Sequence, residues 1–270
     1  MVTPTQAFVD GRPADSAALI RFARNGYHHF TSLQVRNGAV RGLELHLARL
    51  ETATQQLFEA QLDRHELCRQ MLVALAGHTD AGLRISIGAC NYCARSMSGP
   101  ARLETLILVD PPAPAQRDPV RLMSFRHDHA FPTLKHAGNF DLLHLRRQAL
   151  SQGFDDAVLL GPSGEISEGA TFSLGFFAGD ALIWPQAEAL PSTTRQLVHE
   201  ACIAADGQSR ERRLTTADLD DLDAAFCANA GGIWPILAID DHTWPVDTAR
   251  MRYLQGLWDS ISAVAISTFA

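Results

Sequence analysis

The sequence predicts an α+β protein of two domains. Hydrophobic residues make up 46% of its 270 residues, which is enough apolar material for a packed core. Strand patterns and helix patterns follow one another irregularly, without the regular strand–helix alternation of a parallel α/β fold. Between residues 110 and 119 the chain carries four prolines, through which neither a helix nor an inner strand can continue. We therefore expect a small α+β domain over residues 1–110, a linker over 111–119 and a large domain over 120–270.

In the small domain, the apolar pattern predicts strands and two helices. The dipeptide Asn37-Gly38 favours a tight turn between two short strands. Leucines at positions 43, 47, 50 and 57 recur at helical spacing, and Gly77 is a typical helix end. The elements expected in order are strands 7–11, 31–35 and 39–41, helices 43–59 and 64–76, and strands 83–89 and 103–109.

In the large domain, apolar residues again recur at spacings typical of strands in some segments and of helices in others. Gly153 is placed to end one helix, and Ser192 is a residue type that caps the start of another. The elements expected in order are strand 120–125, helix 141–152, strands 157–160, 171–177 and 181–184, helix 193–205, a short helix from Thr216, strands 225–228 and 236–239, and helix 247–262.

Charge and composition argue against several functional classes. The net charge of −7, without a basic face, disfavours a nucleic-acid partner. The sequence has no run of about 20 apolar residues, the length that spans a membrane. The first residues lack the pattern of a secretory signal, so we expect a cytoplasmic location. Five cysteines are too few and too scattered for a disulfide framework, and the pair Cys90 and Cys93 is a weak redox or zinc signal.

One residue type is nearly absent. Lys135 is the only lysine among 23 lysine and arginine residues. A guanidinium cannot lose its proton at a workable pH, whereas a lysine amine can be tuned to act as a nucleophile. Lys135 is therefore either a reactive amine or an ordinary surface residue in a composition that favours arginine, and the count alone leaves both open.

Six segments identify a resemblance that spans the chain from about Phe8 to Ile239. They read LELHLARL (43–50), KHAGNF (135–140), GFDDAVLL (153–160), GEISEGATFSLGFF (164–177), LPSTTR (190–195) and FCANAGGIWPI (226–236). In this order and spacing they resemble the class IV aminotransferases, which include branched-chain and D-amino acid aminotransferases and aminodeoxychorismate lyase. The resemblance implies a two-domain fold like that of D-amino acid aminotransferase, with the cofactor between the domains, and a homodimer.

The cofactor that the resemblance implies is pyridoxal phosphate. Lys135 matches the lysine that forms the Schiff base and then moves the substrate's α-proton. Glu168 matches the carboxylate that pairs with the pyridine nitrogen and keeps it protonated, so that the ring can accept electrons. A helix start favours a phosphate through its free N–H groups and its dipole. The phosphate contacts implied are Arg49, Thr193, Thr194 and Asn229.

Substrate contacts are less well defined. Arg84 matches a position where some members of the family bind the substrate carboxylate, and the segment 26–32 matches the substrate side of the site. The side chains implied there are His28, His29 and Thr31. Each of these site residues also has an ordinary interpretation, as a solvated arginine, a capping threonine or a turn residue. The family interpretation is preferred because it accounts for all of them together with the only lysine.

The sequence departs from the family pattern at three positions. Phe140 replaces a tyrosine whose hydroxyl reaches the cofactor's phenolic oxygen, Ser192 replaces a glycine, and Ser173 replaces an asparagine. The segment FCANA favours the lyase branch, whereas the asparagine in KHAGNF favours the aminotransferases. The branch is therefore left open.

We expect a pyridoxal phosphate-dependent aminotransferase that transfers an amino group between an amino acid and a 2-oxo acid. The main alternative is a lyase like aminodeoxychorismate lyase, which releases pyruvate. A third is a family member that has lost catalysis and binds only the cofactor or a partner protein. A metal-dependent hydrolase is a remote alternative, because four histidines fall within eighteen residues but fit no known ligand template. These histidines are His127, His129, His136 and His144.

Overall fold

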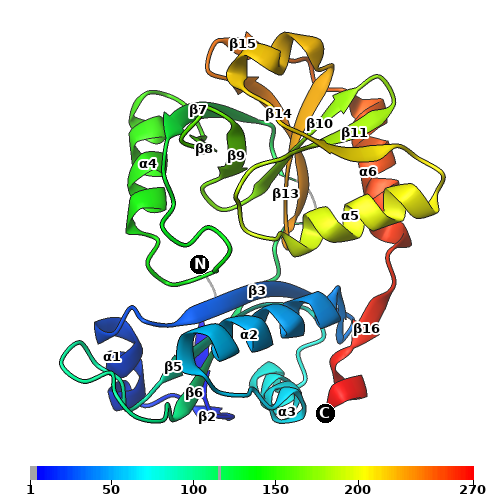
Figure 1. Ribbon diagram of the computed structural model, residues 1–270. Helices are drawn as coiled ribbons and strands as arrows, with labels where there is room; N and C mark the ends of the chain where they lie inside the picture. Colours follow the sequence, from blue (N-terminus) through cyan, green and yellow to red (C-terminus); the bar gives the residue numbers. More distant parts are fainter. Residues whose placement is uncertain (1–4, 115–116) are drawn as a thin grey trace. The chain divides into compact units, whose positions relative to one another are not determined.

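The computed structural model describes residues 5–114 and 117–270 and divides into two compact units (Figure 1). Unit 1 comprises Met1–Ala113, Leu134–Gly138 and Ala263–Ala270, and unit 2 comprises Pro114–Thr133 and Asn139–Ser262. The chain thus leaves unit 1 within the proline-rich stretch, of which residues 115–116 lie outside the described residues. Two short segments far along the sequence group with unit 1, and one of them carries Lys135.

Unit 1 is built on an antiparallel sheet, with seven strands in the described residues in the order β16-β4-β3-β5-β6-β1-β2. The expected hairpin is confirmed, because Asn37 and Gly38 both have the positive φ, 52° and 72°, that this turn requires. The strands are β1 (Gln6–Val9), β2 (Arg12–Pro13), β3 (His29–Arg36), β4 (Ala39–Arg41), β5 (Ala81–Ala89), β6 (Leu103–Asp110) and β16 (Ala263–Ala265).

Two helices of unit 1 share a hydrophobic core with one face of this sheet. Helix α2 (Leu43–Phe58) and helix α3 (Arg64–Leu75) bury their apolar sides against alternate residues of β3 and β5, including Leu33 and Ile85. Both helices begin and end within one residue of the expected bounds. A further short helix, η2 (Ile266–Phe269), contributes Ile266 to the same core.

Helix α1 (Ser16–Arg24) is an element that the sequence patterns do not predict. It has nine residues and buries only Ala18, so its apolar period is too short to be distinctive. The side chain of Asp15 accepts a hydrogen bond from the N–H group of Ala18 and caps its start (2.7 Å).

Unit 2 contains a mixed sheet, with nine strands in the described residues in the order β12-β11-β10-β13-β14-β7-β8-β9 and β15 paired to β14. The pairs β11–β12, β7–β14 and β7–β8 are parallel, and the other pairs are antiparallel. The mixed pairing agrees with the expected α+β class. The strands are β7 (Val120–Arg126), β8 (Asp156–Leu160), β9 (Ile166–Gly169), β10 (Ser173–Ala178), β11 (Ala181–Pro185), β12 (Ser209–Arg212), β13 (Ala224–Asn229), β14 (Gly232–Ile239) and β15 (His242–Thr243).

The helices of unit 2 pack on this sheet in two places. Helix α5 (Thr193–Ala204) and helix α6 (Thr248–Ser260) enclose a core around Trp184 and Phe226. Helix α4 (Phe140–Ser151) packs beside β7 and β8 (Figure 1), and η1 (Thr216–Asp221) is a short 3-10 helix. In the described part of the chain, no helix is both long and apolar enough to cross a membrane.

Candidate active site

Lys135 lies in the loop between β7 and α4 and is held against the edge of β3 by its backbone. The N–H group of Phe30 donates to the carbonyl of Lys135 (2.8 Å), and the N–H group of Ala137 donates to the carbonyl of His28 (2.9 Å). A bridge between His29 and His136 completes this pairing. The only lysine is therefore fixed to the sheet of unit 1, although it lies more than a hundred residues further along the chain.

The ring of Phe30 lies next to two cations. The Nζ atom of Lys135 is 5.0 Å from the ring centre, and the guanidinium carbon of Arg84 is 3.5 Å from it. A cation over an aromatic face is attracted by the ring's electrons. Burial lowers the pKa of the Arg84 guanidinium from its ordinary value, and the charge of Asp110 opposes this shift. The structure thus brings Lys135 and Arg84 together around Phe30, a residue that the sequence analysis missed because a phenylalanine in a strand is typical of any core.

Arg49 and Lys135 are linked through one buried histidine, whose pKa the charges of both lower. His46, one helical turn before Arg49 on α2, is 3% exposed, and a hydrogen bond joins its Nδ1 atom to the Oγ1 atom of Thr31 (2.7 Å). Burial lowers the pKa of His46 to about 3, and the nearby charges of Arg49 and Lys135 add to this shift. His46 is therefore neutral at ordinary pH and lies close to both cations. The motif LELHLARL contained this histidine, but only its arginine was singled out.

The remaining proposed substrate residues have different surroundings. His29 and Thr31 are 1% and 0% exposed and face α2, where the Nε2 atom of His29 is 3.0 Å from the Oγ1 atom of Thr54. His28 is half-buried, and its Nδ1–H group donates to the carbonyl of Asn25 (3.0 Å). The structure therefore separates His28 from His29 and Thr31, because successive side chains of a strand point to opposite faces.

In unit 2, Glu168 lies on β9 and is brought close to the segment that leads into α5. The N–H group of Leu190 donates to its Oε1 atom (3.4 Å). Thr193 and Thr194 begin α5 and are 5% and 1% exposed, and the hydroxyl of Ser192 caps the helix by accepting from the N–H group of Arg195 (3.3 Å). The first turn of α5 therefore offers N–H groups, two buried hydroxyl side chains and the positive end of the helix dipole.

Asn229 ends β13 in a tightly packed turn. Its amide donates to the carbonyl of Thr171 (3.2 Å), and its Oδ1 atom accepts from the N–H group of Gly231 (2.9 Å). A Cβ atom on Gly231 would meet the guanidinium of Arg117, so this side chain lies directly against the turn. Arg117 also stacks over the ring of Trp234, with its guanidinium carbon 4.3 Å from the ring centre.

Arg117 is a second residue that the sequence analysis missed, because it lies in the stretch read only as a linker. Burial lowers the pKa of its guanidinium from the ordinary value. No ion pair or hydrogen bond joins its side chain to another of the described residues. A half-buried cation without a counter-charge beside a glycine turn is suited to bind an anion.

These residues fit the chemical groups of pyridoxal phosphate. Unit 1 offers the amine of Lys135 for an aldehyde and the cation of Arg49, and unit 2 offers a carboxylate, a helix start and a glycine turn beside an arginine. Pyridoxal phosphate carries an aldehyde, a ring nitrogen and a phosphate, which are the partners of such groups.

The histidine-rich segment does not form a metal site in the described residues. His127 pairs with Asp141 (3.0 Å), and its ring contacts that of His129. Among residues 5–114 and 117–270, no group of three or more His, Cys, Asp or Glu side chains is placed to hold a metal ion.

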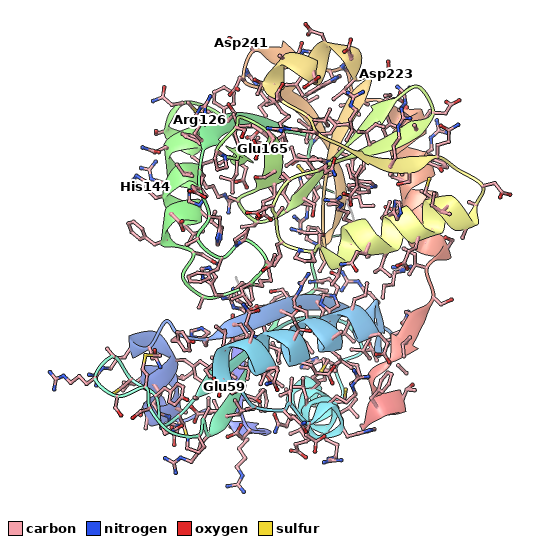
Figure 2. All side chains as sticks on the ribbon, viewed as in Figure 1. Glu59, Arg126, His144, Glu165, Asp223 and Asp241 are labelled. Carbon is pink, nitrogen blue, oxygen red and sulfur yellow. The ribbon has the colours of Figure 1, made fainter. Side chains whose placement is uncertain are left out.

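Phe140 begins α4 and is 81% exposed. Its ring stacks on that of His144, which points outward from α4 (5.9 Å between ring centres; Figure 2). At this position the side chain has no hydroxyl to offer a cofactor.

Solved structures with this fold were found in several organisms. The 4-amino-4-deoxychorismate lyase of Pseudomonas aeruginosa is 26% identical, with a TM-score of 0.78 over 94% of this chain and 99% of that chain. The branched-chain amino acid aminotransferase of Thermobaculum terrenum in its PLP-form is 21% identical, with a TM-score of 0.84 over 97% and 94%. A hypothetical aminotransferase of Mycobacterium tuberculosis in a PLP-bound form is 19% identical, with a TM-score of 0.76 over 89% and 90%.

No curated protein matches the sequence significantly. The structural likeness shows that the chain has the fold of these enzymes. A sequence profile described as amino-transferase class IV matches residues 28–239, which is most of the chain, and the protein therefore belongs to the class IV aminotransferase family.

Proposed function

We propose that the protein is a pyridoxal phosphate-dependent aminotransferase that moves an amino group between an amino acid and a 2-oxo acid. The observation that carries the proposal is the placement of Lys135. The only amine side chain of the sequence belongs to a segment whose backbone is joined to β3 by two hydrogen bonds, and its Nζ atom lies beside Phe30, the ring that Arg84 also contacts. The pairing sets the amine beside the guanidinium that is proposed to bind the substrate carboxylate.

The reaction requires a proton to leave the substrate's α-carbon and return elsewhere. Bound pyridoxal phosphate supplies the electron sink that makes this proton acidic. In the proposal, the amine of Lys135 accepts the proton and delivers it again, acting as the general acid and base. Glu168 keeps the pyridine nitrogen protonated through its negative charge, while the N–H group of Leu190 orients its carboxylate.

Anion binding is assigned to residues of both units. Arg49, Thr193, Thr194 and Asn229 are proposed to hold the cofactor phosphate, and Arg117 is added to them because it lies against the glycine turn that follows Asn229. For the substrate carboxylate we propose Arg84, whose guanidinium lies over Phe30 beside Lys135. His29 and Thr31 support α2 from their buried positions, and His28 lines a cavity described below.

Release of pyruvate is the second candidate reaction. It is favoured by the segment FCANA and by the 26% identity to the lyase of Pseudomonas aeruginosa. The two reactions use the same lysine, so they are separated by their products. In one assay, L- and D-amino acids are offered with pyruvate or 2-oxoglutarate, and amino transfer is measured. In the other, pyruvate release from an aminodeoxychorismate-type substrate is measured. Pyruvate release without transfer to any oxo acid would overturn the aminotransferase proposal.

Borohydride reduction provides the direct test of the site. We expect the purified protein to be yellow, and borohydride to remove this band while fixing one cofactor to the peptide that carries Lys135. Lys135→Arg keeps the charge but offers neither a nucleophile nor a usable base, so activity and covalent attachment are lost. Peptide mapping separates Lys135 from the N-terminal amine. If Lys135→Arg remained active, or if reduction of a cofactor-replete sample attached nothing, the mechanism would be wrong.

A further inference from the structure

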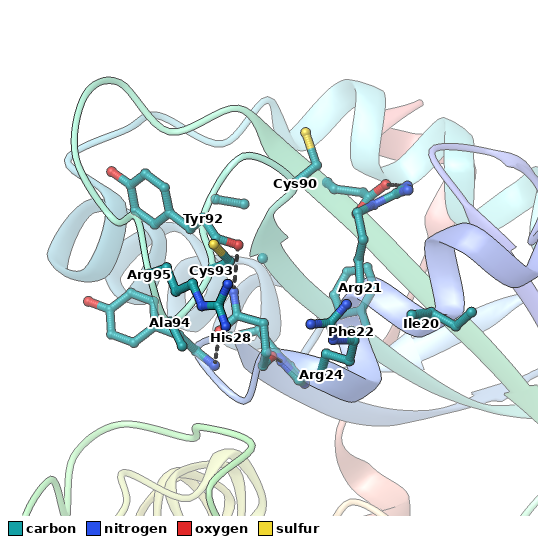
Figure 3. A pocket seen from close by; sticks show the side chains of 15 residues that line it. Ile20, Arg21, Phe22, Arg24, His28, Cys90, Tyr92, Cys93, Ala94 and Arg95 are labelled. Carbon is teal, nitrogen blue, oxygen red and sulfur yellow. Dashed lines mark hydrogen bonds and ion pairs between the residues drawn. The ribbon is translucent and has the colours of Figure 1, made fainter.

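Unit 1 contains a cavity of about 450 Å³ between α1, the ends of β5 and β3, and the loop that joins β5 to β6 (Figure 3). This volume lies within the range of small-molecule sites. None of the residues proposed to hold the cofactor lines it, and His28 is the only proposed substrate residue that does. The cavity is therefore a feature of its own within unit 1.

The walls of the cavity are tied together by side-chain contacts. Asn25, at the end of α1, donates from its amide to the carbonyl of Tyr92 in the loop (3.1 Å). Arg21 of α1 forms an ion pair with Glu104 of β6, and Glu104 is only 6% exposed. These two contacts join the helix to both ends of the loop. The cavity is therefore formed before any ligand arrives.

The charge of the cavity is positive. Glu104 is its only carboxylate, and Arg21 neutralises it. Arg24 and Arg95 also line the cavity, and neither side chain makes an ion pair or hydrogen bond with another described residue. The wall of one cavity therefore carries two guanidinium groups without a counter-charge among the described residues, and a carboxylate matches their planar donors.

The cavity also presents aromatic surfaces. The hydroxyl of Tyr92 donates to the carbonyl of Gly99 (2.8 Å), and the hydroxyl of Tyr27 donates to the carbonyl of Leu57 (3.2 Å). Both hydroxyls are thus engaged by the protein, and both tyrosines line the cavity. Phe22 and the exposed side chain of Ile20 add apolar area, with Ile20 53% exposed. Exposed apolar surface rimmed by charge is typical of a binding site.

We infer that this cavity binds a small aromatic carboxylate, with its ring against the aromatic side chains and its carboxylate held by Arg24 and Arg95. Lys135 does not line this cavity, so occupancy does not require the cofactor. This goes beyond the proposed transfer reaction and holds whether that reaction is amino transfer or pyruvate release.

The experiment uses 2-naphthoate as the probe and follows its fluorescence polarisation with the full-length protein, with and without cofactor. We expect saturable binding of one molecule per chain. The neutral 2-naphthamide should bind more weakly. The double variant Arg24→Gln/Arg95→Gln should weaken 2-naphthoate binding by about tenfold or more, since it removes two charge-assisted contacts. Ala94→Trp fills the cavity without changing its charge and should also weaken binding.

Two control variants separate this site from the rest of the protein. Arg12→Gln removes an exposed arginine elsewhere on unit 1 and should leave the affinity unchanged. Arg84→Gln removes the proposed substrate arginine and should also leave it unchanged. If wild-type protein bound no 2-naphthoate, or if the double variant bound it as well as the wild type, the inference would be wrong. Loss of binding in Arg84→Gln alone would place the probe in the proposed active site and would equally overturn it.

Discussion

At the scale of single residues, the proposed proton transfer depends on the negative charge of Glu168, which keeps the pyridine nitrogen protonated. Glu168→Gln keeps the size of the side chain and an oxygen that can accept from the N–H group of Leu190. The amide has no charge to keep the pyridine nitrogen protonated, so we expect bound cofactor but a fall in kcat of about a hundredfold or more, roughly 3 kcal/mol. The absorbance of the bound cofactor measures its occupancy, and a steady-state assay measures kcat. Wild-type turnover would show that Glu168 is only a strand residue.

A separate prediction concerns the contribution of Arg117 to cofactor affinity. Arg117→Gln removes a half-buried cation beside the Asn229 turn, so pyridoxal phosphate should bind about tenfold more weakly and excess cofactor should restore activity. Absorbance titration of cofactor-free protein gives the affinity. Arg210→Gln, an exposed arginine on β12 of the same unit, serves as the control. An unchanged cofactor affinity with a raised KM would contradict this prediction and would indicate that Arg117 binds the substrate and not the cofactor phosphate.

The residues that sequence reasoning missed share a physical cause. Phe30 and Arg117 acquire their surroundings from contacts with residues far away in the sequence, Lys135 and Gly231, which no local pattern reveals. Lys135 was found because its type is unique in the chain, and the motif residues were found through a resemblance. Local chemistry predicts what a side chain can do, whereas long-range packing decides what it touches.

At the scale of elements, β3 and α2 share a buried polar layer that makes unit 1 sensitive to acid. Burial lowers the pKa of His29 to about 4 and of His46 to about 3, below the ordinary value of 6.5. Below pH 6.5 the unfolded chain binds protons that the folded chain does not, so stability must fall as the pH falls from 6.5 towards 4. Each group contributes about 1.4 kcal/mol per pH unit over this window.

Denaturant unfolding between pH 7 and pH 4.5 measures this slope. In His46→Leu the slope of the unfolding free energy against pH should lose the contribution of one proton, about 1.4 kcal/mol per pH unit. This holds even though the variant is less stable, because the slope depends on titration and not on the absolute stability. His78→Gln removes an exposed histidine and should leave the slope unchanged. A slope equal to that of the wild type in His46→Leu would contradict the prediction.

Helices α2 and α3 were predicted to within one residue, whereas α1 and β9 were missed. Helices α2 and α3 have full turns of apolar residues directed at one core. Helix α1 buries only Ala18, and β9 has four residues next to a turn, so neither carries enough periodic signal. The carboxylate of Glu168 therefore lies on a strand where the sequence suggested a turn.

At the scale of the whole molecule, the chain leaves unit 1 within the proline-rich stretch, and two distant segments group with unit 1 again. The prolines mark the exit, because they stop regular structure locally. Pairing of Lys135 with β3 and of β16 with β4 joins residues far apart in the sequence, and such pairing is set by tertiary contacts. The fold became predictable only through the resemblance.

Unit 2 carries exposed apolar side chains on α4 and in the loop that precedes it. Phe140 is 81% exposed, Phe131 is 58% exposed and Leu143 is 53% exposed. An apolar surface of this kind is typical of a contact with another protein. We expect a second copy of the chain to cover it, as the family resemblance implies, so that sedimentation at micromolar concentration should give twice the mass of 29.5 kDa.

A charge placed on this surface tests the expected dimer. Leu143→Arg puts a guanidinium on the exposed side of α4, and burying it in an interface without a partner is costly, so the protein should shift towards the monomer. Val73→Arg on α3 of unit 1 is the matched control, because Val73 is also 53% exposed. A dimer that withstands Leu143→Arg but dissociates with Val73→Arg would place the interface on unit 1. A wild-type protein that is monomeric and fully active at micromolar concentration would overturn the dimer itself.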